Sequence, residues 1–481
     1  MVVQHNLTAM NSNRMLGITT GQQAKSSEKL ASGYQINRAA DDAAGLSISE
    51  KMRKQMRGLD RASTNAQDGI SAVQTAEGAL TEVHAMLQRI NELAVQAANG
   101  TNSEDDRAAI QAEVEQLTTE IDRVAESTKF NESYLLKGDE GTMDMHVKAH
   151  DAGIAGKLST TLTTATFTTD VKAGDKITIG GREYEIGISE AQAEAMVKAG
   201  ATVSIDGRDF KITADGKATD LADKPLYVET KVPSDTAATF KVTSALTTDA
   251  STVKKLDGTT DLTNAEVVLA NVQEYIAPGS KVSDGTTEYT VVSPADDSVI
   301  ELSKAYELIK AELEIANSIG TDEEVTVTNV QDGSFTWTLG TAEVAKTLSF
   351  NLHVGADADM TNKIGVDIEA MSAAGLGIKG LNVADDNGMS ATYAIDAIAD
   401  AVAKVSAQRS ALGAIQNRLE HTIANLDNVV ENTTAAESRI RDTDMASEMV
   451  EYSKNNILAQ AGQSMLAQAN QATQGVLSLL G

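Results

Sequence analysis

The sequence contains no cysteine, and this absence excludes several classes of site. Without thiols the chain has no disulfide framework, no zinc–thiolate site and no cysteine nucleophile. Aromatic residues make up only 3% of the chain, with Trp337 as the one tryptophan. Cores that are poor in aromatics and rich in Ala, Leu, Ile and Val are typical of helix–helix seams. The composition therefore favours helical packing over large mixed cores.

Proline is almost as scarce, and its few copies are confined to the middle of the chain. The four prolines are Pro225, Pro233, Pro278 and Pro294. Both flanks therefore lack the residue that most strongly interrupts a helix. Because 481 residues exceed what one compact core accommodates, we expect several domains.

The chain also lacks the signals of a membrane or nucleic-acid protein. No apolar run approaches the roughly 20 residues of a membrane span. The N-terminus has no basic start followed by an apolar stretch, so no secretory signal peptide is visible. The formal net charge is −29, whereas phosphate binding needs clustered Lys and Arg. We expect neither a membrane nor a nucleic acid as a partner, and any export would use another route.

A long helical pattern follows residue 41. Its apolar residues recur at alternating steps of three and four, with an upstream extension in steps of seven. They are Met52, Leu59, Ala66, Val73, Ala76, Leu80, Val83, Leu87, Ile90, Ala94 and Ala97. This spacing predicts a coiled-coil seam. A break at Gly100 follows, and Ser103 with acidic residues after it predicts the start of a second, antiparallel helix.

The same rhythm returns near the C-terminus, at about 391–440. Its apolar positions are Ile395, Ile398, Val402, Val405, Leu412, Leu419, Ile423, Leu426 and Val430. Arg409 and Gln416 interrupt the pattern. Three long helices with compatible seams predict one bundle that brings the two ends of the chain together.

The extreme ends carry a weaker helical pattern. After Lys454 no charged residue occurs. The apolar residues of these two stripes are Val3, Leu7, Met10, Leu458, Met465, Val476 and Leu480. An isolated helix with one weak apolar face is marginal in water. We therefore expect the two ends to bury these stripes against each other and against neighbouring molecules.

The middle of the chain is rich in Thr, Asp and Gly and alternates like strands. Gly-Gly and Asp-Gly turns predict β-hairpins. The hairpins are expected at 176–186, 202–212 and 281–292, short helices at 189–198 and 302–319, and a last strand pair at 348–354 and 363–368.

The predicted fold is therefore multidomain and mainly α, with a long antiparallel coiled-coil bundle built from both termini and inserted α+β, hairpin-rich central domains. The expected segments are helices at 1–40, 41–137, 391–443 and 444–481, an α+β region at 138–345, and a β-hairpin region at 346–390 that returns to the bundle.

Two patterns that resemble metal sites lack an essential residue. His146 and His150 have the spacing of a zinc-protease motif, but Val147 replaces the Glu that would act as general base. Their surroundings alternate like a strand. Asp357 begins like a calcium loop, yet Ile368 stands where a bidentate Glu is needed. No nucleotide or hydrolase motif occurs in a suitable context. We expect neither an enzyme nor a cofactor.

Several strings at the two ends have a recognisable order. They are Leu30–Asn37, Ala39–Leu46 and Gln88–Gln96 near the start, and Ala411–Leu419, Glu437–Ala446 and Val476–Leu480 near the end. In this order they resemble flagellins, the subunits of bacterial flagellar filaments. The middle, about 150–345, has no such match, and flagellins themselves vary in this region.

The resemblance implies an extracellular subunit that polymerises with itself for swimming motility. Segments 1–40 and 444–481 would line the inner tube, 41–137 and 391–443 would form the outer tube, and 138–345 would project from the surface. Export would use the flagellar type III apparatus. The implied partners are other copies, a flagellin export chaperone, filament cap and hook-junction proteins, and vertebrate Toll-like receptor 5.

One helix face is a candidate interface. It comprises Met86, Arg89, Leu93, Gln96, Glu113 and Leu117. Leu93 and Met86 lie beside the seam rather than in it, so we expect an outward-facing Leu flanked by Arg89. The resemblance implies that Arg89, Leu93 and Glu113 contact neighbouring protofilaments and the receptor. Many flagellins have a second Arg where this chain has Asn91. The alternative is a solvated helix face.

A second group of charges marks the junctions between inner and outer helices. It comprises Arg38, Asp41, Asp42, Arg439, Arg441 and Asp442. These residues are candidates for charge pairs that set the register between subunits. Helix capping and solvated charge are the alternative, because exposed pairs stabilise little individually.

Other functions fit the sequence less well than a filament subunit. A hook–filament junction protein shares the helical end design, but the long matching strings favour the main subunit. A chemoreceptor-like coiled-coil hairpin would need a membrane span. An adhesin or hydrolase in the middle region would show a sugar- or metal-dependent activity there.

Overall fold

The computed structural model describes residues 6–219, 221, 272–273, 276–331, 333–385 and 388–478, with backbone alone at 330–331 and 473–478. The chain divides into two compact units. The first consists of Met1–Thr75, Ser349–Asp367 and Ser410–Gly481, and the second of Ala76–Leu348 and Ile368–Arg409. Helices α2 (Ala43–Ala97) and α8 (Met389–Arg441) contribute residues to both units.

The seam predicted for α2 is confirmed. Val73, Ala76, Leu80, Val83, Leu87, Ile90, Ala94 and Ala97 are all buried. Asp42 begins the helix, since its Oδ1 accepts hydrogen bonds from the N–H groups of Ala44 and Gly45 at 3.0 and 2.9 Å. The heptad spacing therefore gives both the helix and its buried face.

Helix α3 (Glu104–Ser127) begins where the sequence predicts. Ser103 and Asp106 form a reciprocal capping box, which satisfies two backbone donors at the helix start. The buried Arg107 donates from Nε to the carbonyl oxygen of Ala97 at 3.0 Å. This bond satisfies one of the carbonyls that the end of α2 leaves free.

Helix α8 has a mostly aliphatic buried face with polar interruptions. Its buried aliphatic positions include Ile398, Val405, Leu412, Leu419 and Leu426. The interruption at Arg409 is explained by an ion pair with Glu77, whose nitrogen and oxygen lie 3.7 Å apart.

A β-hairpin covers part of the helices within the first unit. Strands β17 (Leu348–His353) and β18 (Lys363–Ile368) are antiparallel neighbours, as predicted. Val354 and Ile364 form a cluster with Ala66 of α2 and Leu419 of α8. A Cβ at Gly69 of α2 would collide with the side chain of Leu352, so this glycine permits the close approach.

The second unit contains the inserted α+β region. Strands β4 (Lys157–Thr160), β5 (Thr164–Thr168), β14 (Val327–Gln331) and β15 (Ser334–Thr338) form a sheet in the order β14-β15-β5-β4. Helix α6 (Leu302–Asn317) packs on it, with the rings of Tyr306 and Phe335 in an edge-to-face contact at 5.9 Å.

The three predicted hairpins are confirmed. They are β6 (Lys176–Ile179) with β7 (Arg182–Gly187), β8 (Thr202–Ile205) with β9 (Arg208–Ile212), and β11 (Lys281–Ser283) with β12 (Glu288–Thr290). The last two hairpins join one sheet with β10 (Ala218–Thr219), and β7 pairs in parallel with β13 (Val299–Glu301). Gly180 and Gly181 both have positive φ at the first turn, as a Gly-Gly hairpin turn requires.

The remaining elements are short. They are the strand pairs β1 (Lys129–Phe130) with β2 (Ser133–Tyr134) and β3 (Asp139–His146) with β16 (Thr341–Lys346), the helices α4 (Glu190–Met196) and α7 (Ala373–Leu376), and the 3₁₀ turn η1 (Met360–Asn362). The predicted fold, mainly helical at both ends with hairpin-rich insertions, is confirmed. None of the described helices has the length and apolar character of a membrane span.

The seam of α2 generates a stability prediction. We expect Leu80→Ala to lower the free energy of unfolding by about 2–5 kcal/mol, because it opens a cavity at a fully buried position. Val95→Ala is the matched control on the same helix. Its side chain is exposed, so its effect should stay within about 0.5 kcal/mol. Urea unfolding followed by far-UV circular dichroism measures both. Equal effects of the two substitutions would contradict the assigned seam.

Candidate functional site: the terminal helix pair and its junction

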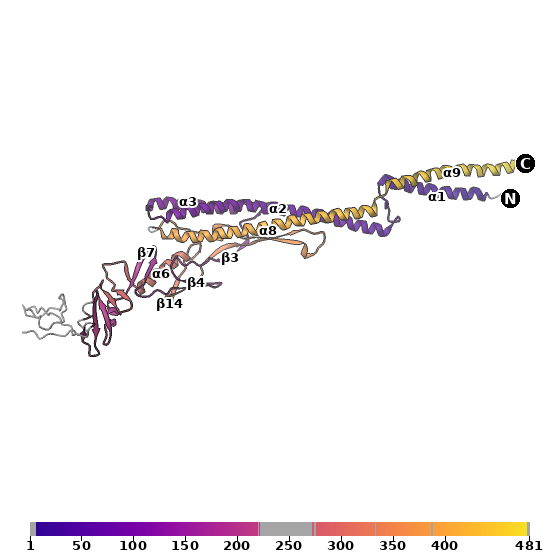
Figure 1. The fold of residues 1–481 in the computed structure, drawn as a ribbon. Coiled ribbons are helices and arrows are strands. Elements are labelled where there is room, and N and C mark those ends of the chain that lie inside the picture. The colour runs from indigo at the N-terminus through magenta and orange to yellow at the C-terminus, as the bar shows by residue number, and fades with distance from the viewer. Residues whose placement is uncertain are drawn as a thin grey trace, which may run out of the picture. The chain divides into compact units, whose positions relative to one another are not determined.

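Helices α1 (Leu7–Ser32) and α9 (Met445–Ser478) pack side by side and antiparallel within the first unit (Figure 1). Asn6 Nδ2 donates to the carbonyl oxygen of Ala469 at 3.1 Å, whereas Lys29, near the other end of α1, pairs with Glu448 at 3.6 Å. These two contacts fix both the direction and the register of the pair.

The seam between the two helices is made mostly of small and polar side chains. Its buried or half-buried positions include Ala9, Ser12, Leu16, Thr19, Gln23 and Ser26 on α1, and Tyr452, Asn455, Ala459, Gly462, Leu466 and Ala469 on α9. A Cβ at Gly462 would lie 3.4 Å from Leu16 Cδ1, so the backbones approach closely there. The seam therefore buries little apolar surface.

The predicted packing of the terminal stripes against each other is wrong. Leu458 and Met465 are 50% and 57% exposed, and Leu7 and Met10 are exposed as well. The face of α9 that packs on α1 carries Asn455, Ala459 and Gly462. It is a different face from the one that carries Leu458 and Met465. A prediction made from apolar periodicity gives no weight to small and polar residues. These are the residues that allow the two helices to approach most closely. Val3 and Leu480 lie outside the described residues, as does the side chain of Val476.

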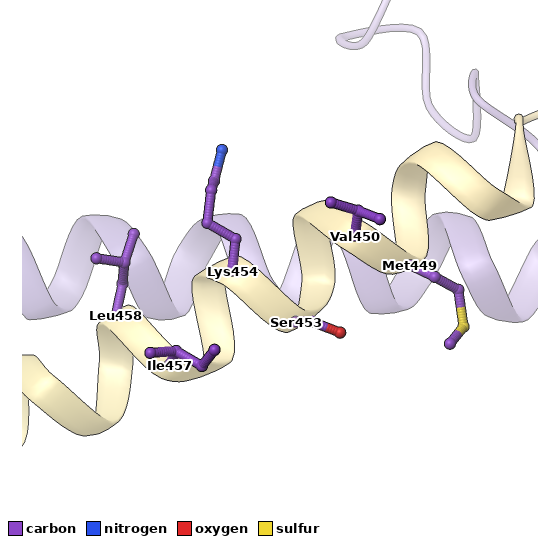
Figure 2. Close-up of a pocket in the computed structure, with 6 residues that line it drawn as sticks. All are labelled: Met449, Val450, Ser453, Lys454, Ile457 and Leu458. Carbon is purple, nitrogen blue, oxygen red and sulfur yellow. The ribbon is translucent and has the colours of Figure 1, made fainter.

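Both helices consequently present large apolar side chains to solvent. We call these residues the terminal apolar set: Leu7, Met10, Met15, Ile18, Met445, Met449, Val450, Ile457, Leu458 and Met465. Figure 2 shows part of the set on α9, where Met449, Val450, Ile457 and Leu458 line a shallow hollow together with Ser453 and Lys454. Clustered exposed apolar side chains of this kind mark surfaces that bind other molecules.

A short loop joins α1 to α2 and contacts the turn between α8 and α9. Gly33 ends α1 in the left-handed conformation, with φ of 75°. Its carbonyl accepts from the N–H of Thr443 at 2.9 Å, and the N–H of Gln35 donates to the carbonyl of Arg441 at 2.7 Å. Two segments far apart in sequence are thus held together by backbone hydrogen bonds. We call this region the junction.

Arg441 is the central side chain of the junction. Its guanidinium lies 4.9 Å from the ring centroid of Tyr34, and its Nη1 lies 2.6 Å from Glu50 Oε1. The Arg441 hydrogen bond lowers the pKa of Glu50 below its ordinary value of 4.5. One cation therefore links α8 to the start of α2 and to the loop after α1.

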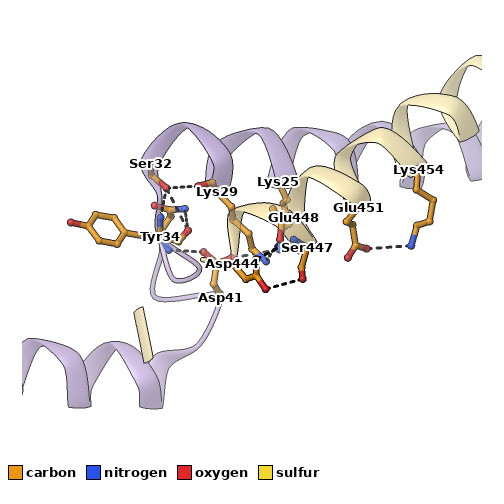
Figure 3. Close-up of polar contacts among 11 residues, drawn as sticks. Lys25, Lys29, Ser32, Tyr34, Asp41, Asp444, Ser447, Glu448, Glu451 and Lys454 are labelled. Carbon is orange, nitrogen blue, oxygen red and sulfur yellow. Dashed lines mark hydrogen bonds and ion pairs between the residues drawn. The ribbon is translucent and has the colours of Figure 1, made fainter. Parts of the chain in front are cut away.

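Acidic side chains in the junction accept hydrogen bonds from backbone groups (Figure 3). The N–H groups of Arg38 and Asn37 donate to Asp41 Oδ2, and with the nearby Lys25 they lower the pKa of Asp41. Asp444 begins α9 by accepting from the N–H groups of Ala446 and Ser447. These carboxylates satisfy helix-end and loop donors.

The six predicted register residues do not form one cluster. The side chain of Arg38 pairs with Glu28 at 2.9 Å, and Asp42 caps α2. Asp442 takes part through its backbone, in a bridge to Tyr34. Arg439 is exposed and makes no ion pair among the described residues. Of the six, Arg441 alone joins a C-terminal segment to an N-terminal one through its side chain. Tyr34 and Glu50, its partners, were not singled out from the sequence, although Tyr34 lies in one of the matching strings.

On the predicted bundle face, Arg89 is the best-placed charge. It lies 2.9 Å from Glu113 of α3 and 3.2 Å from Glu92, and these carboxylates raise its pKa. Gln96 is exposed, and Met86 and Leu117 are half-buried.

The expected outward placement of Leu93 is wrong, since Leu93 is only 2% exposed. The buried face of α2 is wider here than a single stripe, because Leu93 and Ala94 are both covered. The outward apolar residue on this stretch is Val95, which the sequence argument did not single out.

The two metal-like patterns occupy the positions expected of ordinary structure. His146 ends strand β3, as its alternation predicts, and His150 Nε2 lies 3.6 Å from Asp400. Asp359 caps a 3₁₀ turn, and Ile368 is buried in β18. Among the described residues no group of three or more His, Asp or Glu could hold a metal ion.

Comparisons with known proteins agree with the resemblance at both ends. Residues 3–140 match the bacterial flagellin N-terminal helical region, and residues 395–480 match the C-terminal helical region. A flagellin from Clostridium tyrobutyricum is 38% identical over 98% of this chain and 100% of its own length. Flagellin B from Vibrio anguillarum is 33% identical over 100% of this chain and 99% of its own length.

Among solved structures, a flagellar hook associated protein-3 from Legionella pneumophila is similar over 81% of this chain and 98% of its own. Its sequence identity is 14% and its TM-score is 0.32, a likeness that supports no conclusion about function.

The junction should loosen in acid. Because the folded-state pKa of Glu50 is lowered, its stabilisation is complete above the ordinary value of 4.5 and is lost as the pH falls through the folded-state value. We expect Glu50→Gln to speed hydrogen exchange in segment 33–42 by up to roughly fivefold at pH near 6, and to have no further effect in acid. Glu431→Gln, exposed on α8, is the control. If Glu50→Gln leaves hydrogen exchange in segment 33–42 unchanged, the Arg441–Glu50 pair does not hold the junction together.

Proposed function

The chain belongs to the flagellin family, and on this premise we propose that it is the repeating subunit of a flagellar filament whose terminal apolar set forms contacts between copies. The flagellin family is a family of structural filament proteins, not of enzymes. The finer assignment concerns which residues form the contacts between copies. It rests on the terminal helix pair.

One observation carries this proposal: α1 and α9 pair mainly through small and polar residues and leave most of their large apolar residues exposed. Each buried CH₂ group stabilises by about 0.8 kcal/mol, so covering these side chains would favour association strongly. A surface of this kind is costly for a protein that stays monomeric. Burial against other copies removes that cost.

Repetition of one contact by helical symmetry gives a filament. If the apolar set of one chain contacts a different face of the next chain, the contact does not close into a ring and growth continues. We assign 1–40 and 444–481 to the inner tube, 41–137 and 391–443 to the outer tube, 138–345 to the exposed surface, and 346–390 to the return hairpin. The junction around Arg441 then holds the terminal pair to the bundle helices and sets its register.

Partners follow from the same proposal. We propose an extracellular location on the bacterial flagellum and a motility function. Before assembly the exposed apolar set needs cover, which favours an export chaperone on the way through the type III apparatus. Cap and hook-junction proteins would contact the two ends of the filament.

The Arg89 face supports a second binding function, recognition by Toll-like receptor 5. Arg89 and Glu113 form a charged pair that is half-exposed on adjoining helices, and Gln96 and Val95 are exposed nearby on α2. A rigid Arg with fixed hydrogen-bond geometry is a typical centre of an interface. Leu93 is buried, so its part is to support the face rather than to reach a partner.

The assembly role can be tested on α9. We expect Ile457→Ser with Leu458→Ser to leave monomer helicity unchanged and to abolish elongation of filament seeds, because both side chains are exposed in the monomer and covered only in the polymer. Removal of residues 455–481 should have the same effect. Seeded growth followed by light scattering and negative-stain electron microscopy measures the outcome.

The matched control is Leu162→Ser. This residue is also highly exposed, but it lies between β4 and β5. The Leu162→Ser variant should therefore elongate filament seeds normally. Normal filaments from the double variant or from the truncated chain would refute the assignment of α9.

The receptor role can be tested on α2. We expect Arg89→Ala to lower receptor signalling by about tenfold or more, as loss of a central interface Arg does. Arg123→Ala removes a comparable exposed pair with Glu120 on α3 and serves as the control. A cell reporter for Toll-like receptor 5, dosed with purified monomer, gives the readout. Equal signalling from both variants would place the receptor surface elsewhere.

A further inference from the structure

The distribution of methionine is uneven with respect to exposure. The chain has 15 methionines and no cysteine, so thioethers are its only oxidisable sulfur. Five methionines lie on the two terminal helices, and all five are exposed, by 47% to 65%. They are Met10, Met15, Met445, Met449 and Met465. Half of the terminal apolar set is therefore methionine.

We propose that these five methionines are an oxidative modification site, at which a peroxide converts an assembly-competent chain into one that cannot join a filament. The inference rests on the proposed function, because it takes the terminal apolar set to be the contact between copies. It adds a chemical class of reactant, a reversible covalent change and a consequence for assembly.

The chemistry is balanced and local. The thioether sulfur attacks one oxygen of hydrogen peroxide, so that an S–O bond forms as the O–O bond breaks. The departing oxygen takes the proton of the attacked oxygen and leaves as water. The sulfur loses two electrons and the peroxide gains them. The product is a polar sulfoxide, which methionine sulfoxide reductases convert back. In Figure 2 the Met449 side chain projects from α9 with its sulfur at the outer side.

The change acts directly on the contact. A thioether packs well in an apolar interface, whereas a sulfoxide oxygen needs a hydrogen-bond donor when buried. The α1–α9 seam itself contains no methionine among its buried positions, so the helix pair should survive oxidation. The effect is therefore specific to contacts between copies rather than to folding of the subunit.

Assembly should in turn protect the sulfurs. In a free chain a peroxide reaches all five side chains. In a filament the same side chains are covered, so their oxidation should slow by at least about tenfold. Met143 and Met360 provide an internal reference, because both are exposed but lie on β3 and in the β17–β18 loop. They should oxidise at similar rates in monomer and filament.

The experiment compares full-length monomer and preformed filament treated with hydrogen peroxide. Mass spectrometry of peptides gives the sulfoxide fraction at each methionine over time. Oxidised monomer is then offered to untreated filament seeds, before and after treatment with methionine sulfoxide reductases. We expect oxidised monomer to elongate seeds at least about tenfold more slowly, and reductase treatment to restore growth.

Two variants locate the effect. Replacing the five terminal methionines with leucine, a volume-conserving change, should make elongation resistant to peroxide. Replacing Met143 and Met360 with leucine should leave it sensitive. If the five-leucine variant does not elongate at all, the reductase rescue of the natural chain still decides the question.

Three outcomes count against the proposal in distinguishable ways. Normal elongation by a chain shown to carry all five sulfoxides would overturn it and leave the filament role intact. Equal oxidation rates of the five methionines in monomer and filament would show that these side chains are not part of the contact between copies. Failure of the untreated chain to elongate seeds would refute the filament role, and the modification site with it.

Discussion

The seam between α1 and α9 is narrow because its side chains are mostly small. The exposure of the terminal apolar set depends on this narrow seam. With Gly462 facing Leu16 and mostly small or polar residues along the rest of the seam, the two helices pack closely while most of their large apolar residues stay outside it. Those residues then remain in water on the outer faces of the pair. A wide seam of leucines would have produced a stable and self-sufficient hairpin. The narrow seam leaves the pair only weakly stabilised by itself and exposes the surface on which the proposed assembly depends.

The junction gives this weak pair a fixed attachment within its unit. Backbone bonds from Gly33 and Gln35 to the Arg441–Thr443 turn hold α1 and α9 at their common end, and Arg441 adds contacts to Tyr34 and Glu50. Backbone bonds suit such a place because they define geometry without demanding a long side chain in one rotamer. Individual exposed ion pairs contribute little energy, so the register is best understood as the product of several small contacts.

Sequence periodicity predicted the bundle helices well, and the reason is physical. The stripe from Val73 to Ala97 is apolar at every step, so it defines the helix face that is buried. Gly-Gly and Asp-Gly turns favour tight two-residue connections, so they define where a strand pair reverses direction. The candidate site was less predictable. Leu93 was misplaced because a stripe gives the centre of a buried face but not its width. The face of α9 was misplaced because Asn455 and Gly462 carry no hydrophobic signal. The partner of the Arg38 side chain could not be read from the sequence: the side chain pairs with Glu28, whereas the nearer Asp41 accepts from the Arg38 backbone N–H.

The absence of proline from the long helices has a kinetic consequence. All four prolines lie between 225 and 294, so α1, α2, α3, α8 and α9 contain no X–Pro bond. Isomerisation of such bonds takes roughly tens of seconds, whereas helices form in about a microsecond and short loops close faster still. The chain also has no cysteine, so thiol pairing cannot trap a misfolded intermediate. Refolding of the helical regions is thus free of prolyl isomerisation and of disulfide exchange, two of the slow steps that delay other proteins.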